Sequence, residues 1–87
     1  MYYLIAQEMV ERRFRKLDAN KMASKLRILR REQGETQAET AEAVGITAAA
    51  YGMYETGERI PRDPIKEKLA EHFKKSIEFI FFDKSNH

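Results

Sequence analysis

The stretch TQAETAEAVGITAAAYGMYETG, residues 36–57, decides the fold of this chain. Its first four residues follow the pattern T-x-x-E, a capping box that predicts a helix over 37–44. Gly45 is suited to a tight turn, and Thr47 is placed to cap a second helix over 48–55. Two short helices joined by a glycine-containing turn are typical of a helix-turn-helix.

Further helices are predicted on both sides of this stretch. Apolar residues at three- and four-residue steps predict an amphipathic helix over 2–18, and another helix is predicted over 22–33. Asp63, followed by a proline, is interpreted as the N-cap of the next helix, and Ser76 as the cap of a last short one. The predicted fold is therefore all-α. The residues expected to form one core are Leu26, Leu29, Ala41, Val44, Ile46, Tyr51, Tyr54, Ile65, Leu69, Phe73, Ile77 and Ile80.

The length of 87 residues leaves room for one small domain. We expect an N-terminal helical arm over 1–21, a folded domain over 22–82 and a disordered tail over 83–87. The absence of cysteine excludes disulfide scaffolds and cysteine-ligated zinc sites. No apolar run approaches the length of a membrane span, so no membrane association is expected.

Charge is distributed unevenly along the chain. Residues 11–31 contain nine basic and two acidic residues, whereas residues 32–58 contain six glutamates and no Lys or Arg. A basic block beside an otherwise neutral domain favours a polyanion partner, and nucleic acid is the commonest one for a soluble protein. The alternative is that much of this charge forms solvated helix faces.

The segment LRILRREQGETQAETAEAVGITAAAYGMYETGERIPRD, residues 26–63, resembles the Cro/repressor-type (XRE-like) helix-turn-helix family of bacterial and phage transcription regulators. The resemblance covers about residues 23–82. It implies a five-helix, lambda-repressor-like DNA-binding domain, to which residues 1–21 add an arm.

The resemblance also implies roles for single residues. Gln37 matches the residue that contacts a DNA phosphate at the N-terminus of the first motif helix, where free N–H groups favour an anion. Its alternative is an ordinary polar residue of the first turn. Arg30 and Glu55 match a pair that forms a structural ion pair between the first helix and the end of the recognition helix.

The recognition helix departs from the family pattern. Thr47 precedes it, and its base-facing positions are occupied by Ala48, Ala49, Gly52 and Met53. None of these four side chains donates a strong hydrogen bond to a base edge. Three interpretations stay open: thymine-methyl contacts with readout of DNA shape, specificity from flanking residues, or loss of DNA binding.

Residues outside the motif complete the predicted surfaces. In the following loop, Arg59 and Arg62 are expected to contact the DNA backbone, whereas Lys25 and Arg27 are interpreted as solvated surface cations. Phe79 and Phe82 are expected to form an exposed apolar strip, which favours a homodimer interface over simple packing on the arm.

The sequence thus predicts a cytoplasmic, sequence-specific transcription regulator, expected to be a repressor that binds a two-fold operator in double-stranded DNA as a homodimer. The alternative is a helix-turn-helix protein-interaction module, antitoxin-like or adaptor, with weak or no DNA binding. The sequence contains no recognisable pairing of a catalytic nucleophile with a general base. It also contains no recognisable phosphate-binding loop or metal-ligand cluster. We therefore expect no enzyme activity, cofactor, metal or small-molecule substrate.

Overall fold

The structure, a computed structural model, describes residues 18–82. This part of the chain contains five helical elements and no strand, so the all-α prediction is confirmed. The elements are a helix over 18–32, α2 (Gln37–Val44), α3 (Ala48–Thr56), α4 (Asp63–Phe73) and a π-helical turn η1 (Glu78–Phe82). The predicted arm up to residue 17 and the tail over 83–87 lie outside the described residues.

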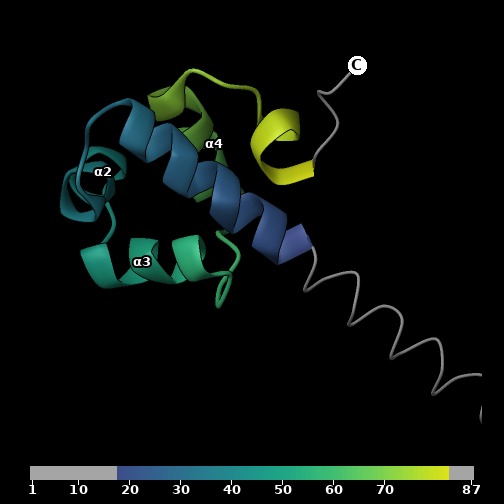
Figure 1. Cartoon of the computed structure of the whole chain (residues 1–87), viewed down its shortest axis with the longest axis horizontal. Helices are drawn as coiled ribbons and strands as arrows, with labels where there is room; N and C mark the ends of the chain where they lie inside the picture. The colour runs from purple at the N-terminus through teal and green to yellow at the C-terminus, as the bar shows by residue number, and fades with distance from the viewer. Residues whose placement is uncertain (1–17, 83–87) are drawn as a thin grey trace, which may run out of the picture.

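The helix over 18–32 is the longest described element and runs across the others (Figure 1). It contacts α3 through Arg30 and Glu55, and η1 through Lys25 and Phe79. Helix α2 packs against both α3 and α4. The helix-turn-helix is thus held from two sides, by α4 and by the helix over 18–32.

The core lies between these helices. Leu26, Tyr51, Leu69 and Ile80 are at most 1% exposed. The predicted core residues that are buried are Leu26, Leu29, Ala41, Val44, Tyr51, Tyr54, Leu69, Phe73 and Ile80. The other three are partly buried and pack against this cluster, namely Ile46, Ile65 and Ile77. The predicted core is therefore confirmed, with three of its members at the margin.

Local hydrogen bonds set the ends of the two motif helices as predicted. The Thr36 hydroxyl accepts from Glu39 N at 3.1 Å, and the Glu39 carboxylate accepts from Thr36 N at 2.9 Å. Gly45 ends α2 in the left-handed region, with φ 75°. The Thr47 hydroxyl accepts from Ala50 N at 3.1 Å. The capping box and the turn are confirmed.

The start of α4 differs from the prediction. Its N-cap is Arg62, and Asp63 is already the first helical residue, with Pro64 second. The N–H groups of Ile65 and Lys66 both donate to the carbonyl of Arg62 at 2.9 Å, so no side-chain cap is formed. The Asp63 carboxylate instead lies 3.5 Å from the Lys66 ammonium group, within the first turn of the helix.

The helix predicted to begin at Met22 already includes residues 18–21. Ala19 is buried beside Gly57, the residue that ends α3 with φ 80°. A β-carbon on Gly57 would lie 3.2 Å from Asn20 Oδ1 and 3.4 Å from the carbonyl oxygen of Ala19. Packing against the end of α3 therefore overrides the turn preference of Asn20.

Candidate nucleic-acid interface

The N-terminal ends of α2 and α3 are exposed. Gln37 lies at the start of α2, while Thr47, Ala48 and Ala49 lie at the start of α3, and all four are exposed. A helix N-terminus presents unpaired N–H groups and the positive end of the helix dipole. The start of α3 carries no acidic residue and offers this positive end to a phosphate, whereas the Glu39 carboxylate in the first turn of α2 offsets part of it.

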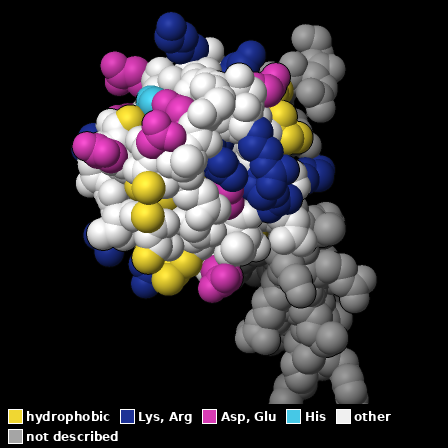
Figure 2. Space-filling view, turned by 60° about the vertical axis from the view of Figure 1, so that its left-hand side comes forward, with side chains coloured by type: hydrophobic (Ala, Val, Ile, Leu, Met, Phe, Trp, Pro, Cys, Tyr) yellow, Lys and Arg dark blue, Asp and Glu magenta, His cyan; other side chains and the backbone are white. Residues whose placement is uncertain are grey.

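The remaining predicted contact residues lie further along α3 and in the loop after it. Gly52 and Met53 are half-buried, so they are less accessible than the start of the helix. Arg59 and Arg62 are exposed, and Arg59 N donates to the carbonyl of Met53 at 3.2 Å, which fastens the loop to α3. The space-filling view in Figure 2 shows one gathering of Lys and Arg side chains and, separately, a row of hydrophobic groups.

Glu55 is a buried charge at the other end of α3, with a side chain 1% exposed. Its carboxylate accepts from Arg30 Nε at 2.6 Å and from Arg30 Nη2 at 3.1 Å. It also accepts from Gln37 Nε2 at 3.0 Å. The structure therefore brings together the two residues that the resemblance pairs, and adds Gln37 to them.

Gln37 is held by its hydrogen bond to Glu55 and lies next to Gly52 of α3. Its nitrogen donates to Glu55, and its oxygen lies 3.5 Å from the position that a β-carbon on Gly52 would take. The amide nitrogen carries two hydrogens, so one donor remains when Glu55 has taken the other. Gln37 therefore combines a structural contact with an exposed position at the start of α2.

The hydrogen bonds to Glu55 stabilise its charged form. Burial opposes ionisation of the carboxyl group, but donation by Arg30 and Gln37 outweighs this and holds the pKa of Glu55 below its ordinary value. The pKa of Tyr51 is raised, first by burial of the phenol and then by the neighbouring Glu55 carboxylate. At neutral pH Glu55 is therefore ionised and Tyr51 is neutral.

Lys25 and Arg27 are not the solvated cations that the sequence suggested. Lys25 Nζ donates to the carbonyl of Phe79 at 2.6 Å and lies 4.9 Å from the centre of its ring. Arg27 donates to the main-chain carbonyl of Glu55 and to Ser24 Oγ. Phe79 and Glu55 are 54 and 28 residues away from them, so the interpretation from local charge was wrong.

The two phenylalanines predicted at a dimer interface differ in exposure. Phe79 is partly buried and packs against the core, so it does not belong to an exposed strip. Phe82 is 52% exposed, and Lys66 Nζ lies 5.4 Å from the centre of its ring. Of the two, Phe82 alone presents a largely exposed apolar side chain.

A second polar cluster joins α2 to α4. Glu35 Oε1 accepts from Thr40 Oγ1 at 2.9 Å and lies 2.7 Å from His72 Nε2. Hydrogen bonding by His72 is the main reason that the pKa of Glu35 is lowered. The sequence assigned no role to His72, and nothing in the local pattern links it to a residue 37 positions earlier.

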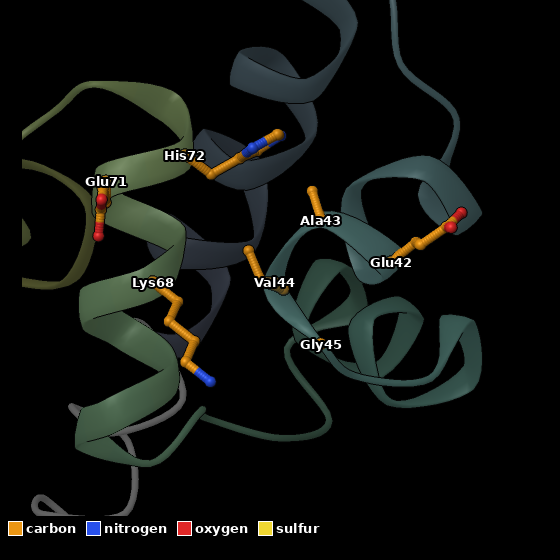
Figure 3. Close-up of a pocket in the computed structure, with 7 residues that line it drawn as sticks. All are labelled: Glu42, Ala43, Val44, Gly45, Lys68, Glu71 and His72. Carbon is orange, nitrogen blue, oxygen red and sulfur yellow. The ribbon is translucent and has the colours of Figure 1, made fainter.

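An open pocket of about 570 Å³ lies between the end of α2 and α4 (Figure 3). Its polar side chains come from both helices, with Glu42 on α2 and Lys68 on α4. His72 at its edge is bonded to Glu35. In residues 18–82 no group of three or more His, Asp or Glu residues could hold a metal ion. No described helix is long and apolar enough to cross a bilayer.

The helix-turn-helix family model matches residues 26–80. The match covers more than half of the chain, and it coincides with the described helices from Leu26 to Ile80. No curated protein and no solved structure matches the chain. The chain belongs to the Cro/repressor-type, XRE-like helix-turn-helix family, whose members bind DNA. Helices α2 and α3 form the motif that defines the family.

The Glu55 cluster predicts a specific dependence of stability on pH. Glu55→Gln should lower the free energy of unfolding at pH 7 by about 3 kcal/mol, because it leaves Arg30 without its counter-charge. Folding lowers the pKa of Glu55, so the stabilisation is present above the unfolded pKa and is lost as the pH falls through the folded pKa. The difference in unfolding free energy between wild type and variant should therefore be smaller in acid than at pH 7, as urea titrations at the two pH values would show.

The matched control is Glu42→Gln, which removes an exposed carboxylate from α2. We expect it to change the free energy of unfolding by no more than about 0.5 kcal/mol at either pH. The role of ionised Glu55 as the partner of Arg30 would be contradicted if the difference in unfolding free energy between wild type and Glu55→Gln stayed constant or widened in acid.

Proposed function

We propose that this protein is a cytoplasmic transcription repressor that binds a two-fold DNA operator as a homodimer. The observation that carries the proposal is the exposure of the first turns of α2 and α3 in a helix-turn-helix whose far end is fixed by Glu55. In this arrangement two helix N-termini approach the same duplex, one at the phosphate backbone and one at the base edges.

Phosphate contacts supply most of the affinity in this proposal. Gln37 would donate its remaining amide hydrogen to a phosphate at the start of α2, and Arg59 and Arg62 would bind the backbone beside α3. Both arginines are exposed, and Arg62 makes no side-chain cap on α4. These residues can therefore reach a ligand without giving up an interaction that holds the fold.

Base contacts must come from small or apolar side chains. Ala48 and Ala49 are exposed, but they offer only methyl groups, which can contact the methyl group of thymine. Readout of DNA shape would add discrimination at base pairs that the protein does not touch. We therefore propose that α3 positions the protein and contributes little hydrogen-bonded discrimination.

Selection of bound sequences from random duplexes, followed by affinity measurements over a range of salt concentrations, tests this function. We expect a two-fold consensus and an affinity that falls by about 10³ or more between 50 and 200 mM salt, as for six or more neutralised phosphates. Arg62→Ala should reduce the salt slope by about 0.9 for each phosphate that the variant leaves unneutralised.

The control for the loss of one positive charge is Lys74→Asn. Lys74 is the exposed C-cap of α4 with φ 57°, a conformation that Asn tolerates, so the backbone should be unaffected. We expect its salt slope to equal that of the wild type. If no duplex binds at about 50 mM salt, where phosphate contacts are strong, the regulator is excluded. The exposed Glu39 and Glu42 of α2 would then favour a protein-interaction module.

The proposed homodimer uses the face that carries Phe82. An isolated apolar side chain can anchor a two-fold contact because the same residue is presented by both copies. Phe82→Asp should convert the dimer to a monomer in sedimentation experiments at micromolar concentration. Ile28→Asp, at an equally exposed apolar residue on the helix over 18–32, is the control and should remain dimeric. A monomeric wild type would contradict the proposal.

A further inference from the structure

The C-terminal end of α3 is completed by a side chain from another helix. The last four carbonyl groups of an α-helix have no partner within the helix. The carbonyl of Met53 accepts from Arg59 N, and that of Tyr54 accepts from Gly57 N. The carbonyl of Glu55 accepts from Arg27, which lies 28 residues earlier on the helix over 18–32.

Arg27 is itself held in place for this contact. Its Nη1 donates to the carbonyl of Glu55, while its Nη2 donates to Ser24 Oγ at 3.1 Å, one turn earlier on the same helix. The guanidinium group is planar, so fixing two of its nitrogens fixes its orientation. The Arg27 side chain therefore contacts α3 in a fixed orientation.

The charge of Arg27 also suits this position. A helix C-terminus carries a partial negative charge that a nearby cation stabilises. Helix α3 has no basic residue in its own last turn. Arg27 supplies this cation from the neighbouring helix.

Two arginines thus hold the same residue of α3 from one helix face. Arg27 binds the main chain of Glu55, and Arg30, one turn later, binds its carboxylate. The two contacts together fix both the position of the helix end and the direction of the side chain. With only one of these contacts, either the position of the helix end or the direction of the Glu55 side chain would be unconstrained.

We propose that Arg27 is a positioning residue of the DNA-binding surface, acting through Glu55. Glu55 also accepts a hydrogen bond from Gln37 Nε2 at 3.0 Å. A change in the position of the end of α3 therefore changes the position of the start of α2 as well. Arg27 thereby keeps the exposed ends of α2 and α3 in one fixed relation. This inference rests on the proposed function, since the two ends need a common alignment only when they meet one duplex.

The test compares DNA affinity and salt slope in Arg27→Gln, Arg27→Lys and Ser24→Ala. Each full-length variant is measured at a temperature where circular dichroism shows it fully folded. With a duplex selected by the wild type, we expect Arg27→Gln to weaken binding about tenfold without changing the salt slope. Arg27→Lys should recover part of the affinity, because an ammonium group can bind the Glu55 carbonyl but cannot also reach Ser24 in the same planar geometry.

Ser24→Ala keeps the charge and removes only the hydrogen bond to Nη2, so it tests the support even if Arg27→Gln fails to fold. We expect a smaller loss of affinity, again at unchanged slope, while Lys74→Asn keeps wild-type affinity.

Three results would overturn the inference while the wild type still binds DNA. Equal affinity of folded Arg27→Gln and wild type would assign Arg27 to stability alone. A slope reduced by about 0.9 would make Arg27 a direct ligand of one phosphate. If Ser24→Ala and Arg27→Lys both bound DNA with wild-type affinity, a guanidinium group fixed by Ser24 would not be needed to position α3. Failure of the wild type to bind any duplex would instead remove the proposed function.

Discussion

A buried carboxylate at the end of α3 constrains the rest of this small domain. Glu55 is 1% exposed, and an unpaired charge at such a depth would be too costly for a fold of this size. The carboxylate therefore requires donors from elsewhere in the chain, and it finds them in Arg30 and Gln37. Three helices meet at this one residue, which determines how the helix-turn-helix is set against the helix over 18–32.

The same device recurs, in a less buried form, on the other side of α2. Glu35 links Thr40 of α2 to His72 of α4 at hydrogen-bond distance. Apolar packing is non-directional, so it brings helices together without setting their rotation. Charged hydrogen bonds need specific geometry. In this protein one polar cluster sets α2 against α3 and the helix over 18–32, and the other sets α2 against α4.

Local signals in the sequence were sufficient for the elements and most of the core. The capping box at Thr36 and the glycine at 45 act within a few residues, so they could be interpreted without knowledge of the fold. The start of α4 could not be predicted in this way, because the N–H groups that an Asp63 cap would have bound donate to the carbonyl of Arg62 instead. The contacts of Arg27, Lys25 and His72 join positions far apart in the chain, and no periodicity reports such distances.

The position of α3 against the helix over 18–32 depends most on Arg30 and Glu55 acting as a pair. A double-mutant cycle on unfolding free energies at neutral pH, with Arg30→Met and Glu55→Leu, tests it most directly. Each single change should destabilise the protein by about 3 kcal/mol, because it leaves one charge buried, whereas the double variant should be within about 1 kcal/mol of the wild type. Additive losses, with a coupling energy below about 0.5 kcal/mol, would show that the two residues act independently and would contradict the account.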